Sequence, residues 1–219
     1  YLDALEMTRR LFTSDHPNVA NSLNNLALLY NNQGKYNEAK PLYLEALEMR
    51  KRLFTSDHPN VASSLNNLAN LYNNQGKYNE AEPLYLDALE MIRRLFTGDH
   101  PYVASSLNNL ANLYNNQGKY NEAEPLYLDA LEMTRRLFTS DHPNVANSLN
   151  NLALLYNNQG KYNEAKPLYL EALEMRKRLF TSDHPNVASS LNNLANLYNN
   201  QGKYNEAEPL YLDALEMIR

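Results

Sequence analysis

Apolar residues return along this chain with a helical spacing, and the same pattern recurs in every stretch of 42 residues. From Val19 to Tyr30 the residues Val19, Ala20, Leu23, Leu26, Ala27 and Tyr30 lie at spacings of 1, 3 and 4 from one another, which places them on one stripe of a helix at about 100° per residue. Asp15 can cap the start of this helix, Pro17 suits its first turn, and Gly34 suits the residue after its end. The pattern therefore predicts an amphipathic helix, called helix A.

A second apolar stripe follows after a short turn. It opens near Asn37 and is carried by Ala39, Leu42, Tyr43, Ala46, Leu47, Leu53 and Phe54. The basic run at 50–52 is favourable near the negative, C-terminal end of a helix dipole. No stretch alternates as a strand would, so each period predicts two helices, A and B, joined by a tight turn.

The period itself determines the expected architecture. The chain holds five full periods and nine further residues, and Tyr1–Arg93 is identical to Tyr127–Arg219. Periods of roughly 20–50 residues indicate a solenoid, in which each repeat packs on its neighbours. We expect an all-α fold, an α-solenoid of helix-turn-helix repeats forming one array over 1–219. Its expected parts are a helix-B fragment at 1–12, helix A/helix B repeats at about 15–54, 57–96, 99–138 and 141–180, and a last repeat at 183–219 that stops inside helix B.

Three repeat types alternate along the array. Only eight positions differ among Tyr1–Leu42, Tyr43–Leu84 and Tyr85–Leu126. They are Asp3/Glu45/Asp87, Thr8/Arg50/Ile92, Arg9/Lys51/Arg93, Ser14/Ser56/Gly98, Asn18/Asn60/Tyr102, Asn21/Ser63/Ser105, Leu28/Asn70/Asn112 and Lys40/Glu82/Glu124. We expect none of them on the main packing stripe and three on the polar side of helix A. This distribution favours a fixed scaffold with a variable surface.

Composition narrows the function. The net charge of −5 and pI near 5.6 argue against a general affinity for nucleic acid or for anionic membranes. The absence of cysteine excludes disulfides and thiolate chemistry. No apolar run reaches the roughly 18 residues of a membrane span, so the cytoplasm is the default expectation.

The residues of the two stripes resemble the tetratricopeptide repeat at Leu26-Ala27, Tyr30, Gly34, Tyr36, Ala39, Tyr43 and Ala46-Leu47. The repeat is longer than the common form of about 34 residues, and Asp57–Tyr85 is similar to the kinesin-light-chain type. The resemblance implies a right-handed superhelix that binds proteins. The near-identity of the repeats favours a bacterial array or an engineered consensus-like sequence over the animal motor subunit.

The same resemblance implies that helix A lines a concave groove, and its polar side is rich in asparagine. Amides can pair with the backbone of an extended peptide. The candidate peptide-binding residues are Asn21, Asn24, Leu28, Asn31, Asn32, Asn66, Asn70, Asn73, Asn74, Asn108, Asn112, Asn115, Asn116, Asn150, Leu154, Asn157, Asn158, Asn192 and Asn196. An alternative interpretation is that Asn24 and Asn25 hydrogen-bond between neighbouring repeats and stiffen the superhelix. A carboxylate clamp is disfavoured, because helix A carries no basic residue on this side.

Other residues predict no chemistry. The histidines at 16, 58, 100, 142 and 184 are one repeat apart, roughly 10 Å for stacked helices, which is too far to share one metal ion. We expect each to hydrogen-bond locally at a helix start, Asp15 to be a cap, and Arg50-Lys51-Arg52 to form a solvated face. Neither an enzyme active site nor a metal or cofactor site is predicted.

Two functions of different classes remain. The first is a non-enzymatic scaffold that binds an extended peptide in the asparagine-lined groove. The second is a structural array that assembles end to end, because the chain starts and stops inside helix B without capping helices. A single-stranded RNA reader is a minor third, since helical repeats can read bases with asparagine, but the groove lacks basic charge.

Overall fold

The computed structural model describes residues 2–12, 15–180 and 183–218, and within these it is helical without a strand. Ser14, one of the eight variable positions, and Tyr1 and Arg219, the expected limits of the array, lie outside the described residues. The helices are α1 (Leu2–Leu11), α2 (Pro17–Asn32), α3 (Tyr36–Leu53), α4 (Pro59–Asn74), α5 (Tyr78–Leu95), α6 (Pro101–Asn116), α7 (Tyr120–Leu137), α8 (Pro143–Asn158), α9 (Tyr162–Leu179), α10 (Pro185–Asn200) and α11 (Tyr204–Glu216). Even-numbered helices are helix A of their repeats, and odd-numbered helices are helix B.

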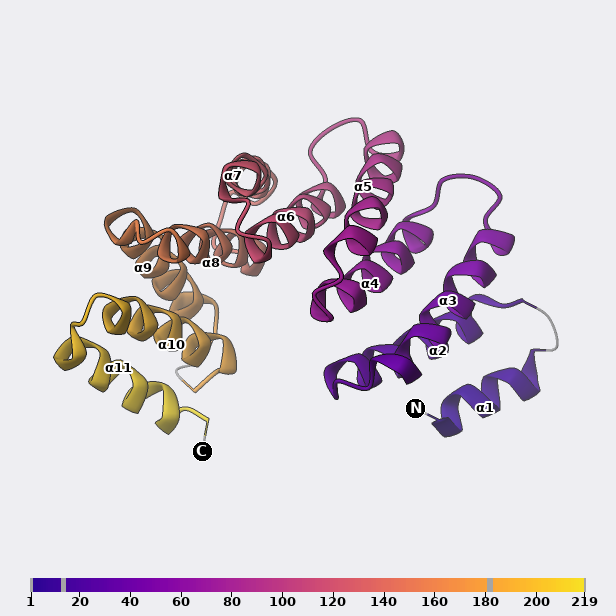
Figure 1. Ribbon diagram of the computed structural model, residues 1–219, viewed down its shortest axis with the longest axis horizontal. Helices are drawn as coiled ribbons and strands as arrows, with labels where there is room; N and C mark the ends of the chain where they lie inside the picture. Colours follow the sequence, from indigo (N-terminus) through magenta and orange to yellow (C-terminus); the bar gives the residue numbers. More distant parts are fainter. Residues whose placement is uncertain (1, 13–14, 181–182, 219) are drawn as a thin grey trace. The chain divides into compact units, whose positions relative to one another are not determined.

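The helices are grouped in two compact units, Tyr1–Gly98 with α1 to α5 and Asp99–Arg219 with α6 to α11. Within each unit neighbouring A helices contact one another, as α2 and α4 do in the first and α6, α8 and α10 in the second (Figure 1). A B helix packs on its own A helix and also on the A helix of the next repeat, as α3 does with α2 and α4. Each of the two units is therefore a stretch of α-solenoid.

Every A helix begins in the same way, and histidine is its cap. His16 has an extended backbone, and its Nδ1 accepts a hydrogen bond from the Asn18 amide at 3.1 Å, while Pro17 occupies the first turn. The other four histidines cap α4, α6, α8 and α10 identically, which confirms their local role. The cap expected at Asp15 is wrong, because its carboxylate pairs with Arg52, with Oδ2 2.5 Å from Nε.

In four of the repeats, the start of the A helix (α2, α4, α6 or α8) is tied to the end of its own B helix. Asp57 meets Arg94 with Oδ2 2.6 Å from Nε, and the same two-pronged contact joins Asp15 to Arg52, Asp99 to Arg136 and Asp141 to Arg178. The hydrogen bond from the guanidinium holds the pKa of the Asp57 carboxyl below its usual value. Phe54, just after α3, stacks on His58 with ring centroids 3.5 Å apart. The turn between these repeats is therefore held both by this ring stacking and by the ion pair of Asp57 with Arg94.

The core is made of small and large residues in alternation. Alanines on facing helices, such as Ala20 and Ala46, are fully buried and let the backbones approach closely. In α3, α5, α7 and α9 the largest buried side chain is a tyrosine, represented by Tyr127. In the second unit one cluster joins Ala111 of α6, Tyr127 of α7, Leu149 and Leu152 of α8 and Met175 of α9. Within the second unit the core is therefore continuous from one repeat to the next, as a solenoid requires.

Candidate peptide-binding face

The predicted site residues lie on one side of the A helices, which we call the helix-A face. Their exposure divides them into three groups. Exposed are Asn21, Leu28, Asn32, Asn74, Asn116, Leu154, Asn158 and Asn196; half-buried are Asn24, Asn66, Asn70, Asn73, Asn108, Asn112, Asn150 and Asn192; buried are Asn31, Asn115 and Asn157. The face therefore combines amides available to a ligand with amides that have a structural role.

The structural amides form two ladders between neighbouring A helices. In the first, the side-chain Nδ2 of one asparagine donates to Oδ1 of the asparagine 43 residues before it: Asn67 to Asn24 at 2.9 Å, Asn151 to Asn108 at 3.3 Å and Asn193 to Asn150 at 2.7 Å. The second joins Asn74 to Asn31, Asn158 to Asn115 and Asn200 to Asn157 at 3.2–3.3 Å. The interpretation that asparagines bond between neighbouring repeats is confirmed for Asn24. At the position of Asn25 the donors are its equivalents Asn67, Asn151 and Asn193.

A variable position of the helix-A face contacts the buried tyrosine of helix B. Where the residue is asparagine, the tyrosine hydroxyl donates to it, as Tyr85 does to Asn70 and Tyr127 to Asn112. Where it is leucine, the side chain stays exposed, 44 % for Leu28. The corresponding Tyr43 is buried, and this desolvation raises the pKa of its hydroxyl to about 12 although a hydrogen bond with Asn31 opposes the shift. Leucine thus adds an apolar contact point to an amide surface.

Arginine from helix B also reaches the helix-A face. Arg50 of α3 is buried, and its guanidinium donates to the Asn60 carbonyl oxygen at 3.0 Å, Ser64 Oγ at 2.8 Å and Asn21 Oδ1 at 2.7 Å. Arg176 of α9 makes the same bonds. Burial lowers the pKa of both guanidinium groups. The solvated face expected for Arg50 is wrong, because the residue fills a space between two A helices.

The variable positions mostly make contacts between repeats. The expectation that they avoid the packing stripe is wrong at one of them, since Arg50, Ile92 and Thr134 are all buried. Two others form an ion pair between successive B helices, with Arg9 Nη2 2.6 Å from Glu45 Oε1. A contact within one repeat has a signal in the sequence, because Asn21 and Arg50 occur together in the same repeats and contact each other.

The tetratricopeptide-repeat model matches this sequence in five overlapping segments, 1–52, 22–93, 60–136, 102–178 and 144–219. The chain belongs to the tetratricopeptide-repeat family. None of the curated proteins matches it.

Several solved structures of other proteins resemble this chain. The crystal structure of BtubC (BKLC) from P. vanneervenii is 27 % identical, with a TM-score of 0.78 and coverage of 98 % of this chain and 87 % of that one. A putative kinesin light chain from Podosopora anserina with nearly identical TPR-like repeats is 26 % identical, with a TM-score of 0.71 and coverage of 93 % and 96 %. NprR in complex with its cognate peptide NprX shares the fold, with 20 % identity, a TM-score of 0.69 and coverage of 97 % and 59 %. The structural neighbours thus include kinesin-light-chain-like repeat proteins.

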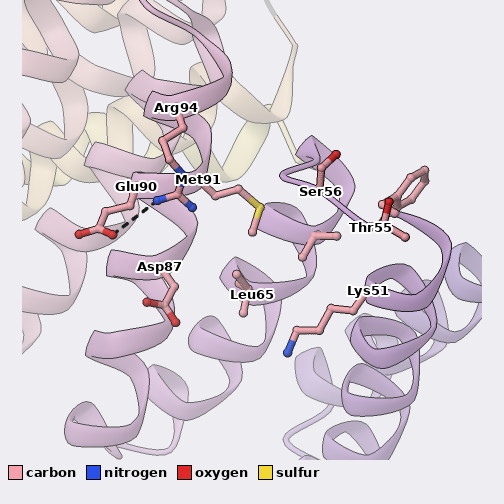
Figure 2. A pocket seen from close by; sticks show the side chains of 10 residues that line it. Lys51, Thr55, Ser56, Leu65, Asp87, Glu90, Met91 and Arg94 are labelled. Atoms are coloured by element: carbon pink, nitrogen blue, oxygen red, sulfur yellow. Dashed lines mark ion pairs between the residues drawn. The ribbon is translucent and has the colours of Figure 1, made fainter.

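The tetratricopeptide array also has a pocket away from the helix-A face. It measures about 320 Å³ and is bordered by α3, α4 and α5. Figure 2 shows Lys51 on one side and Asp87, Glu90 and Arg94 on the other, around Leu65. Lys51 and Asp87 are the equivalents, one repeat further on, of Arg9 and Glu45, which form an ion pair. In the pocket Lys51 instead pairs with Glu48 of its own helix. The pocket thus lies at a step where lysine and aspartate replace the arginine and glutamate of that pair.

In the described part of the chain no three histidine, aspartate or glutamate side chains gather as a metal site would require. None of the helices described is both long and apolar enough to cross a membrane. The charged groups of the pocket in Figure 2 are partly neutralised, since Arg94 lies 3.7 Å from Glu90 and also bonds Asp57.

Proposed function

We propose that this tetratricopeptide array is a non-enzymatic scaffold that binds an extended peptide along the helix-A face. The tetratricopeptide fold is typical of protein-interaction scaffolds, and solenoids use their repeated faces for binding. The observation that carries the finer proposal is a pair of exposed amides in each unit, Asn32 and Asn74 in the first and Asn116 and Asn158 in the second. Each unit also exposes one leucine on the same face, Leu28 in the first and Leu154 in the second.

The ladders support the proposal because they hold the amides in place before a ligand arrives. Asn158, for example, donates one amide hydrogen to Asn115, yet its side chain is exposed. A carboxamide has two donor hydrogens and an acceptor oxygen, so further bonds remain possible for it. Fixed polar groups lose little side-chain entropy on binding, which favours affinity.

The spacing of the repeats suits an extended chain. Neighbouring A helices stack roughly 10 Å apart, and a strand advances about 3.3 Å per residue. A peptide would therefore present every third residue to an equivalent asparagine. Within each unit the exposed leucine, Leu28 in the first and Leu154 in the second, would meet an apolar side chain of a bound peptide. NprR offers a precedent in this fold, since its structure holds a cognate peptide.

The test begins with a library of random dodecapeptides displayed on phage and selected on the protein, followed by fluorescence anisotropy with the recovered peptides. Replacing Asn32, Asn74 and Asn158 by alanine should weaken binding about tenfold or more, because each lost hydrogen bond contributes roughly 1 kcal/mol. Leu154→Asn should also weaken it, and it reproduces the residue of other repeats at this position.

The matched control replaces Asn37, Asn79 and Asn163, which are equally exposed but lie at the start of B helices. These variants should bind as the wild type does. Peptides whose affinity falls equally with both triple variants, or with neither, would contradict a site on the helix-A face. The end-to-end assembly expected from the sequence stays a prediction, for which sedimentation at rising concentration is the measurement.

A further inference from the structure

One interface between A helices differs from its equivalents in a single buried residue. Thr134 of α7 occupies the position that Arg50 holds in α3 and Arg176 in α9. All three side chains are buried between two successive A helices. The protein therefore carries the same interface in two forms, with and without an arginine.

The arginine form shows how this interface recognises a guanidinium group. Arg176 Nη1 donates to the Asn186 carbonyl oxygen at 3.2 Å and to Ser190 Oγ at 2.8 Å. Its Nη2 donates to Asn147 Oδ1 at 2.8 Å. These acceptors are neutral oxygens of the two flanking A helices, and their arrangement suits a planar fork with several N–H groups.

In the threonine form the corresponding space is a pocket of about 170 Å³, which we call the Thr134 pocket. A single water needs only roughly 10–15 Å³, so a larger polar group has room. Its lining, from α6, α7 and α8, is Pro101, Ala104, Ser105, Asn108, Asn109, Asn112, Thr134, Asn144, Asn147, Ser148 and Asn151. Ser105 and Asn147 are exposed while Thr134 and Ser148 are buried, so the pocket leads from the helix-A face into the interface.

The guanidinium acceptors are retained in the Thr134 pocket. Asn144 and Ser148 correspond by sequence to Asn186 and Ser190, and Ser105 takes the place of Asn147. Ser148 Oγ accepts a hydrogen bond from Asn108 at 3.3 Å. Its equivalent, Ser190 Oγ, accepts a shorter bond of 2.8 Å from Arg176. Thr134 turns its own hydroxyl to the Leu131 carbonyl oxygen, at 2.9 Å. The pocket is thus lined by acceptors that, one repeat later, bind arginine.

We propose that the Thr134 pocket binds the guanidinium group of an arginine side chain supplied by a peptide partner. The proposal rests on the proposed function, whose peptide would lie across the mouth of this pocket. An arginine fits better than a lysine, because two of its nitrogens reach acceptors on both A helices at once. The net charge of −5 favours the approach of a cationic peptide.

The test uses three blocked pentapeptides, acetyl-Gly-Gly-X-Gly-Gly-amide with X as arginine, lysine or citrulline, titrated against the full chain by calorimetry and by NMR of the asparagine side chains. The arginine peptide should bind and shift the signals of Asn108 and Asn151, which line the pocket. Citrulline has the same shape without charge and should bind about tenfold or more weakly, because hydrogen bonds from charged donors are the stronger ones.

Two variants occupy the pocket with side chains that the protein already uses at this position. Thr134→Arg supplies an internal guanidinium and Thr134→Ile an apolar filler, as in Arg176 and Ile92. Both should fold, as circular dichroism would verify, and both should abolish binding of the arginine peptide. Thr139→Arg, at an exposed position, adds the same charge elsewhere and should bind as the wild type does.

The outcomes separate this inference from the proposed function. Equal binding of arginine and citrulline peptides, or full binding by Thr134→Arg, would overturn the arginine pocket. If phage-selected peptides then still lose affinity with the Asn32, Asn74 and Asn158 variant, the proposed function stands without it. If the arginine peptide binds and Thr134→Arg blocks it while that triple variant has no effect on selected peptides, the pocket stands and the extended groove does not.

Discussion

At the scale of single residues, asparagine and tyrosine have two roles that the linear pattern does not separate. Asn31 is buried and accepts a hydrogen bond from Asn74, whereas Asn32, next to it, is exposed. Helix geometry rotates neighbouring residues by about 100°, so adjacent amides face different surroundings. Tyr43 is buried with its hydroxyl near the helix-A face and links core and surface.

The buried tyrosine makes the fold sensitive to alkali. Because burial raises the pKa of Tyr43 to about 12, the folded state keeps its proton at a pH where the unfolded chain loses it. The stabilisation is complete below the ordinary value near 10 and declines as pH rises from about 10 to about 12. Tyr43→Phe should reduce this decline, measured as melting temperature between pH 8 and 11. Tyr204→Phe, at an exposed position, is the control, and identical slopes for both variants would contradict the argument.

At the scale of elements, the ends of helices repeat more strictly than their faces. Each A helix starts with a histidine cap and ends before a glycine of positive φ, for example 73° at Gly118. The faces differ where helices of successive repeats meet, as with the Arg9–Glu45 ion pair and with Lys40, whose Nζ lies 5.3 Å from the Tyr72 ring centroid. Thus local structure is constant, and the contacts between repeats carry the variation.

Two glycines provide a matched test of the turn between helix A and helix B. An added Cβ would meet no atom within 4 Å at either Gly118 or Gly98, but only Gly118 has a left-handed backbone. Gly118→Ala should therefore lower the free energy of unfolding by about 1–2 kcal/mol. Gly98→Ala should be neutral or stabilise by about 0.4–1 kcal/mol. Urea unfolding of both variants is the measurement, and equal effects would show that the backbone conformation is not the cause.

At the scale of the whole molecule, stability is distributed among neighbours. The cluster around Leu152 takes its members from α6, α7, α8 and α9, and other clusters take theirs from adjacent helices in the same way. In such arrays the free energy is close to a sum of repeat and nearest-neighbour contributions. A destabilising substitution in one repeat should therefore affect mainly that repeat and its neighbours.

Leu152→Ala tests this locality. The side chain is 2 % exposed, so its truncation should cost about 2–5 kcal/mol in the repeats that contain it. Hydrogen exchange should rise most in α7, α8 and α9 and least in α2 and α3. Leu170→Ala, at a position 38 % exposed, should change stability by less than about 0.5 kcal/mol. A uniform loss of protection along the chain would instead indicate one cooperative fold.

The sequence by itself determined the helices, their pairing and the family, because a 42-residue period with two apolar stripes allows few other arrangements. It also indicated where the amides lie, since helical periodicity fixes their side of the helix. Only the tertiary structure decided what surrounds each side chain. Arg50 belongs to a basic run by sequence, yet it is buried because the acceptors at Asn21, Asn60 and Ser64 come from two other helices. The Thr134 pocket likewise forms only where side chains of three helices, α6, α7 and α8, come together, so the sequence of a single helix does not predict it.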